Sequence, residues 1–173
     1  MKKHVWKIVA AGVVILLAGS FFISNQAAKE ANVGVELQTW VVGNPEASVV
    51  LTEYSDFQCP ACRQFFPVVK DILAEYGEQI RFEYKHFPLI SIHPFAVPAA
   101  RAAEAAGQQG KFFEMHDILF EEQPNWSRSS APEAFFLQYA EQLELDIDMF
   151  KRHMGSSLID EAITDSYREA QGK

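Results

Sequence analysis

The two cysteines of this chain, Cys59 and Cys62, lie where one sequence pattern gives way to another. The stretch just before them, at 49–54, is short and mostly apolar, which is typical of a buried strand. From 60 to 76, apolar side chains recur at helical spacing, and an alternating stretch at 80–84 predicts a further strand. Strand, helix and strand in this order predict a βαβ unit with a right-handed crossover. The cysteine pair should therefore lie at a strand-to-helix junction.

Helical patterns dominate the rest of the chain, and 173 residues suit one folded domain. A strand is also expected within 35–42, after a polar linker at 24–34. A capping box of Ser130 and Glu133 is expected to open one of the later helices. The predicted helices cover 94–106, 111–120, 130–145, 148–153 and 156–170. These patterns predict an α/β fold.

The N-terminus carries a basic cluster, Lys2, Lys3 and Lys7, around the start of an uncharged apolar run at 8–23. Its 16 residues fall between the core of a signal peptide, roughly 7–15 residues, and a spanning helix of roughly 20. We favour a signal anchor that crosses the cell membrane once through residues 5–24. A cleaved signal peptide is the alternative, and a buried core helix is a third reading. Both membrane readings export the domain to the periplasm or cell exterior, an oxidising compartment.

The charge balance excludes one class of partner. The net charge is −8, and the chain beyond its basic N-terminus is more acidic still. A domain of this charge is a poor candidate for binding nucleic acid or anionic lipid surfaces. The sequence also lacks a glycine-rich phosphate loop and an internal repeat.

The cysteine spacing argues for a redox couple. A disulfide that closes a two-residue gap would stabilise the fold very little, because that effect grows with loop length. At the first turn of a helix, free backbone N–H groups and the helix dipole favour a thiolate at Cys59, which makes it the expected nucleophile. Cys62, one turn further on, is the recessed partner that resolves a mixed disulfide. Pro60 and Ala61 between them should tune the reduction potential.

Two other readings of the pair remain open. A metal site would need about two further ligands. The candidate ligands, none at a paired spacing, are His86, His93, His116 and His153. The cysteines could also be inert core residues.

Glu53 stands in an otherwise apolar strand, six residues before Cys59, where an unpaired buried charge would be costly. The favoured interpretation is a proton acceptor for Cys62, with a pKa raised by burial. The alternative is a strand carboxylate that reaches solvent.

The residues that flank the pair are expected to be less specialised. Asp56 and Gln58 are predicted to be solvated loop residues. His93 is expected to begin a helix rather than to act in catalysis. Phe57 and Phe66 are expected to pack in the core.

Taken together, these segments resemble bacterial thiol-disulfide oxidoreductases of the DsbA-like type, within the thioredoxin superfamily. The resemblance is carried by VVLTEYSDFQCPAC at 49–62, YKHFPL at 84–89, and the later runs AARAAEAA at 99–106 and QGKFFEMHDILF at 109–120. It implies a thioredoxin-like domain over 43–173 with a helical insertion at about 92–165, preceded by a signal segment at 1–28 and by a linker and first strand at 29–42.

The resemblance also implies an activity. Members exchange disulfides with exported proteins that carry thiols or disulfides, and a membrane redox partner recycles their cysteine couple, with no cofactor. Glu53 matches the acidic residue that the family places behind the recessed cysteine. Oxidation of substrates is favoured over their reduction or isomerisation. The alternative function is a non-catalytic module that binds a partner or a metal on a truncated scaffold.

The sequence departs from the family pattern in one respect. Members follow the helical block with a cis-proline loop, two antiparallel strands and a final helix. The eight prolines here all lie at or before Pro132, and the sequence ends at Lys173. We therefore expect a C-terminally incomplete fold, and favour a fragment of a longer protein over a shortened member.

Overall fold

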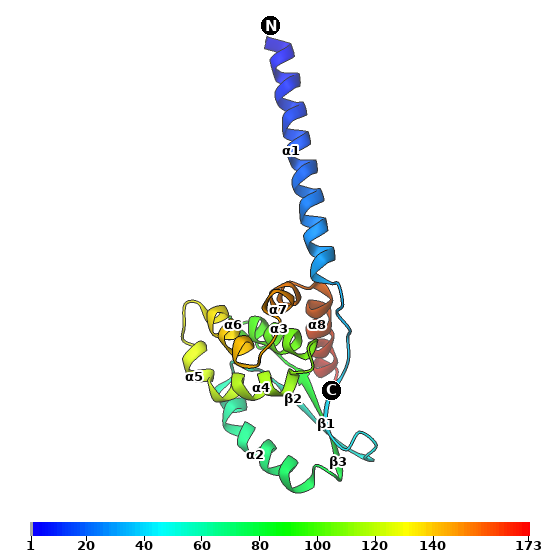
Figure 1. Cartoon of the computed structure of the whole chain (residues 1–173), viewed down its shortest axis with the longest axis vertical. Coiled ribbons are helices and arrows are strands. Elements are labelled where there is room, and N and C mark those ends of the chain that lie inside the picture. The colour runs from blue at the N-terminus through cyan, green and yellow to red at the C-terminus, as the bar shows by residue number, and fades with distance from the viewer. Residues whose placement is uncertain (1) are drawn as a thin grey trace.

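The computed structural model describes residues 2–173, and side chains from residue 12 onward. Figure 1 shows a long N-terminal helix standing away from a body in which shorter helices surround a small sheet. The helices are α1 (Lys2–Ala31), α2 (Pro60–Tyr76), α3 (Ala96–Gly107), α4 (Phe112–Glu121), α5 (Gln123–Trp126), α6 (Pro132–Gln142), α7 (Ile147–Met154) and α8 (Ser157–Gln171). The strands are β1 (Trp40–Gly43), β2 (Val49–Ser55) and β3 (Ile80–His86).

The sheet confirms the βαβ unit expected from the sequence. The described strands lie in the order β1-β3-β2. β2 and β3 run parallel and are joined through α2, while β1 pairs antiparallel with β3. Glu53 of β2 lies beside Tyr84 of β3 in this register. The C-terminal end of β2 therefore leads directly into the turn that carries the cysteines.

The two faces of the sheet pack against different helices. Side chains alternate between the faces along a strand, and Phe82 and Tyr84 are buried against rings of α4, Phe113 and His116. Lys85, on the opposite face, forms an ion pair with a glutamate of α8. The face that includes Glu53 is thus the one covered by α2 and α4.

Two local expectations for the apolar residues are wrong. Val49 and Val50, expected in a buried strand, are 58% and 50% exposed. They begin β2, which is an edge strand among the residues described, so only one side of it is paired. Phe65, one of the apolar side chains that recur at helical spacing over 60–76, was expected to be buried but is 53% exposed, whereas its neighbour Phe66 is buried.

Two element boundaries also differ from expectation, and one helix was not expected. α1 continues to Ala31 through most of the predicted polar linker, because its last turns are rich in Ala, Gln, Lys and Glu, which favour helix. α6 begins at Pro132 with Ala131 at its N-cap and no side-chain cap, so the capping box of Ser130 and Glu133 is wrong. The short helix α5 had no signal in the sequence beyond Pro124 in its first turn.

The N-terminal helix is apolar over much of its length. Its stretch Gly12–Ala31 has a mean hydropathy of 1.3 and is exposed along the described part. By length and composition it could cross a membrane, and a signal sequence would have the same properties. At its end, the side-chain amide of Asn32 hydrogen-bonds Ser157 at the start of α8. This contact ties the base of α1 to the folded body.

Candidate active site

Cys59 is the N-cap residue of α2, as the sequence predicts. Its backbone is extended (φ −72°, ψ 121°), and Pro60 follows in the first turn, where no backbone N–H is needed. The carbonyl of Cys59 accepts the first helical hydrogen bond, from the N–H of Arg63 at 3.1 Å. The free N–H groups of this turn and the positive end of the helix dipole lie at the Cys59 position.

Cys62 lies one turn further along α2 and packs against the hydrophobic core. Both cysteines are free thiols and partly exposed. Burial raises the pKa of the Cys62 thiol, while the Ser55 hydroxyl opposes the rise. Cys62 therefore ionises less readily than a free cysteine, and a nearby base would help it to act as a nucleophile.

Glu53 lies on the core-facing side of β2, beside the buried Tyr84. Burial raises the pKa of its carboxyl, and the Ser55 hydroxyl and the charge of His116 partly oppose the rise. This direction agrees with the expectation that burial raises the pKa of Glu53. Its role as the proton acceptor of Cys62 stays a prediction.

Glu53→Gln is expected to change how stability depends on pH. The folded state holds the Glu53 proton more tightly than the unfolded chain, since its folded-state pKa is raised above 4.5. The protonated Glu53 carboxyl therefore contributes its full stabilisation at pH values below the pKa that Glu53 has in the unfolded chain. This stabilisation is lost as the pH rises through the pKa that Glu53 has in the folded state. The variant should match the wild type at about pH 4 and become relatively more stable towards about pH 8 in urea unfolding. The exposed Glu46→Gln is the control, and parallel pH curves for wild type and Glu53→Gln would contradict the prediction.

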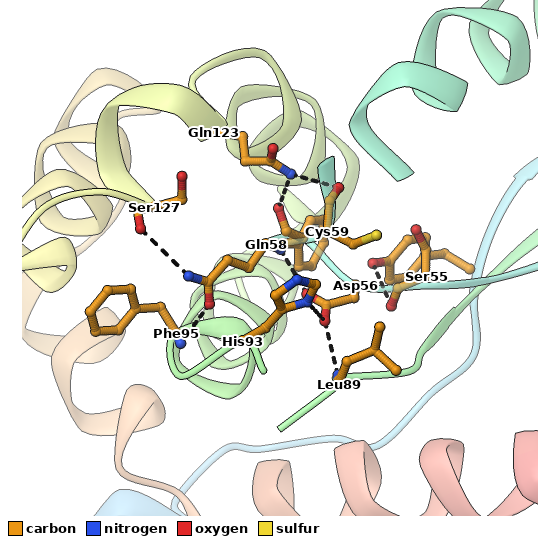
Figure 2. Close-up of polar contacts among 11 residues, drawn as sticks. Ser55, Asp56, Gln58, Cys59, Leu89, His93, Phe95, Gln123 and Ser127 are labelled. Atoms are coloured by element: carbon orange, nitrogen blue, oxygen red, sulfur yellow. Dashed lines mark hydrogen bonds and ion pairs between the residues drawn. The ribbon is translucent and has the colours of Figure 1, made fainter. Parts of the chain in front are cut away.

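Asp56 is buried, at 3% exposure, so its expected place in a solvated loop is wrong. Figure 2 shows that its carboxylate contacts three groups near the turn before Cys59. One oxygen accepts the backbone N–H of Gln58 (2.7 Å), an Asx-turn. The other accepts the N–H of Leu89 (2.9 Å) and lies 2.6 Å from Nδ1 of His93. Asp56 thus ties the cysteine turn to the loop between β3 and α3.

His93 precedes α3, which begins at Ala96, so it lies near the helix start as expected. Its ring is held by Asp56 and lies in the same cluster as the cysteine turn (Figure 2). Among the described residues, the His93 side chain hydrogen-bonds Asp56 and neither cysteine. His93 therefore supports the cysteine turn through its contact with Asp56.

Two glutamines join the cysteine turn to other segments (Figure 2). The side-chain carbonyl of Gln58 accepts the N–H of Phe95 at 2.7 Å, so this residue also departs from the solvated role expected for it. Gln123 of α5 is buried, and its amide nitrogen donates to the carbonyls of Phe57 (2.7 Å) and Cys59 (2.9 Å). The short helix α5, which the sequence did not reveal, therefore fixes the backbone at Cys59.

Gln123→Ala is expected to destabilise the fold by about 1–3 kcal/mol, because the buried carbonyl of Phe57 loses the Gln123 amide as its donor and the carbonyl of Cys59 keeps only the N–H of Arg63. Urea unfolding measures the change. The exposed Gln64→Ala on α2 is the matched control, and its effect should stay within about 0.5 kcal/mol. Equal stability of the two variants would contradict this role of Gln123.

The other histidines do not assemble a metal site with the cysteines. Within the part of the chain whose side chains are described, no group of three His, Cys, Asp or Glu residues could hold a metal ion. His86 instead lies 2.9 Å from Glu104, which also accepts the indole N–H of Trp40. His153 lies 3.0 Å from the carbonyl of Val33.

Curated relatives share part of this chain. Over 114 residues it is 45% identical to the Na(+)/H(+) antiporter NhaA 3 of Salinispora tropica, a match that covers 66% of this chain and 17% of the antiporter. The chain thus spans about a fifth of the length of such relatives. Most of the antiporter lies outside the match.

Solved structures resemble the chain over most of its length. A thioredoxin-like oxidoreductase from Silicibacter pomeroyi has a TM-score of 0.66 at 29% identity, covering 82% of this chain and 77% of that one. The thiol-disulfide exchange protein alpha-DsbA2 from Wolbachia pipientis has a TM-score of 0.66 at 16% identity, covering 86% and 78%. These likenesses confirm the thioredoxin-like α/β fold expected from the sequence. Residues 35–172 match the family model described as thioredoxin, and the chain therefore belongs to that family, among structural neighbours that are thiol-disulfide oxidoreductases of the DsbA type.

Proposed function

We propose that this chain is an exported thiol-disulfide oxidoreductase that exchanges disulfides with protein substrates through Cys59 and Cys62. The observation that carries the proposal is the place of Cys59 at the N-cap of α2, with Cys62 half-buried one turn later and Glu53 on the sheet face beneath. This arrangement supports the assignment of Cys59 as the accessible nucleophile, of Cys62 as the recessed cysteine that resolves the mixed disulfide, and of Glu53 as its base.

The exchange can be written step by step. A substrate thiolate attacks Cys59 Sγ of the oxidised couple, forms a mixed disulfide and releases Cys62 as a thiolate, which takes a proton from the Glu53 carboxyl. A second substrate thiolate then attacks the substrate sulfur of the mixed disulfide. The substrate leaves oxidised, with two electrons transferred to the couple, and Cys59 leaves as a thiolate that the helix terminus stabilises. In the reverse direction, Glu53 accepts the proton of Cys62.

We favour oxidation over reduction or isomerisation of substrates. Stabilising the Cys59 thiolate stabilises the reduced couple, and a stable reduced form makes the disulfide a stronger oxidant. A membrane redox partner would reoxidise the couple after each turnover.

The proposed location is the outer side of the cell membrane. Helix α1 would anchor the chain, since its apolar stretch is long enough to cross and its basic residues would remain in the cytoplasm. Transport is not proposed, because the match covers only 17% of the antiporter.

The test uses the full chain in detergent with a peptide that carries two thiols. The oxidised chain should convert the peptide to its disulfide while the Cys59–Cys62 couple becomes reduced in equal amount. Titration against glutathione then gives the reduction potential and the favoured direction. Absence of exchange in both directions would overturn the proposal, and a metal retained stoichiometrically against a chelator would favour a metal-binding module instead.

A further inference from the structure

Arg63 of α2 is an exposed arginine beside the cysteine pair, and the exchange described above does not use it. It lies one turn after Cys59, and its backbone N–H donates to the Cys59 carbonyl at 3.1 Å. Residues four apart are neighbours on the surface of a helix, and Cys59 is the N-cap of the helix that carries Arg63. The Arg63 side chain therefore leaves the helix on the side of the proposed nucleophile.

A hydrogen bond to the end of α4 holds the Arg63 side chain in place. Its Nε donates to the backbone carbonyl of Phe120 at 3.1 Å. The segment that follows Phe120 also contacts Cys59, since the Gln123 amide donates to the Cys59 carbonyl at 2.9 Å. The stretch 120–123 thus contacts both the Arg63 side chain and the backbone of Cys59, which keeps the guanidinium close to the cysteine turn.

The two terminal nitrogens of Arg63 have no protein partner among the residues whose side chains the structure describes. In contrast, Arg81, Arg101 and Arg168 each form an ion pair with an Asp or Glu side chain. An arginine presents a planar fork of N–H donors, and Nε supplies only one of them. The remaining donors and the positive charge of Arg63 are therefore available to a ligand beside Cys59.

The charge of Arg63 is opposite in sign to that of the chain as a whole. The net charge is −8, so the long-range field of the chain disfavours acidic partners. A carboxylate bound at Arg63 would accept charge-assisted hydrogen bonds, and the planar guanidinium matches the geometry of a carboxylate. The local chemistry beside Cys59 therefore favours a carboxylate, although the net charge does not.

We propose that Arg63 is a specificity-determining residue that binds a carboxylate of the substrate next to the cysteine that reacts with Cys59. This inference rests on the proposed function and names its substrate class, which is proteins with an Asp or Glu beside the reacting cysteine. The covalent step is the one written above. The substrate thiolate attacks Cys59 Sγ, the Cys59–Cys62 bond breaks and its electron pair goes to Cys62, while Arg63 holds the neighbouring carboxylate of the substrate.

The experiment compares three peptides that each carry two thiols and differ only beside the first cysteine, where they have Glu, Gln or Lys. The oxidised full chain in detergent is mixed with each peptide, and the second-order rate constant of peptide oxidation is measured. Dividing it by the rate constant of the same peptide with hydroxyethyl disulfide, a neutral reference, corrects for the intrinsic reactivity of the thiol. The wild type should oxidise the Glu peptide about three- to tenfold faster than the Lys peptide at low salt, because an exposed ion pair contributes modestly.

Variants of Arg63 test whether this residue causes the preference. Arg63→Gln should lower the Glu-to-Lys rate ratio by about threefold or more. Arg63→Lys should retain part of the ratio, because an ammonium keeps the charge but not the fork. The matched control is Arg152→Gln on α7, which removes the same charge from an exposed position and should leave the ratio within about 1.5-fold of wild type. The gap between wild type and Arg63→Gln should narrow as salt rises, because salt screens exposed charges.

Two results would overturn the inference while leaving the proposed function intact. They are an unchanged ratio in Arg63→Gln, and equal corrected rates of the wild type with the Glu and Lys peptides. If Arg63→Gln does not fold, Arg63→Lys decides, because a ratio equal to that of the wild type contradicts the role of the fork and a lower ratio supports it. If the wild type oxidises none of the peptides, the proposed function fails first, so the two failures are distinguishable.

Discussion

Cys59→Ser should abolish disulfide exchange, leaving only the rate of the free thiols in solution. A hydroxyl at the N-cap of α2 cannot form the mixed disulfide that starts the reaction. Cys62→Ser should behave differently, because Cys59 can still react with a substrate disulfide but nothing resolves the product. Exchange with a two-thiol peptide measures turnover, and intact-mass spectrometry under non-reducing conditions, after reaction with the disulfide form of that peptide, measures the trapped adduct.

The pair of variants is its own control. Both serines are close in size to cysteine and occupy the same helix, so a general defect of folding would affect them alike. Accumulation of the adduct in Cys62→Ser but not in Cys59→Ser would identify the nucleophile. The reverse pattern would mean that Cys62 reacts first, and the roles drawn from the N-cap geometry would be wrong.

Phe57→Ala should cost about 3–5 kcal/mol of folding free energy, a typical loss for a large buried aromatic side chain. Phe57 is 1% exposed, and its ring stacks on Tyr84 at 5.2 Å and lies 5.0 Å from Phe120. The truncation would leave a cavity between β3 and α4, directly before the cysteine turn. Urea unfolding of the full chain in detergent measures the loss.

The matched control is Phe65→Ala. Phe65 has the same side chain and lies close by in the chain, but it is 53% exposed on α2. Its truncation should change stability by about 0.5 kcal/mol or less. Similar losses in the two variants would show that Phe57 does not anchor the turn to the core.

Patterns along the chain were enough to locate the elements around the cysteines. The predicted helix after Cys59 corresponds to α2, and the alternation at 80–84 corresponds to β3. The packing roles of Phe57 and Phe66 are confirmed as well. These features depend on spacing and on residue type within a few turns, which is the range that a sequence pattern reports.

The network around the turn could not be predicted in the same way. Asp56 resembles a solvated loop residue because its partners, Leu89 and His93, come from a segment more than 30 residues away. Only the Asx-turn to Gln58 had a local signal, an aspartate two residues before the N–H that it accepts. Gln123 had none, since its two acceptors, the carbonyls of Phe57 and Cys59, lie 66 and 64 residues away in the chain.

The sequence by itself determined the chemistry of this protein: two thiols at a strand-to-helix junction, an acid six residues upstream and an apolar N-terminal run. Each is a matter of residue identity and of local backbone geometry. Only the tertiary structure decided which groups surround them. The burial of Asp56 and the enclosure of His116 against Tyr84 arise where α4 packs onto the sheet and the loop after β3 folds back. Such contacts join segments far apart in the chain, and they form because burying the shared aromatic core outweighs the preferences of each segment alone.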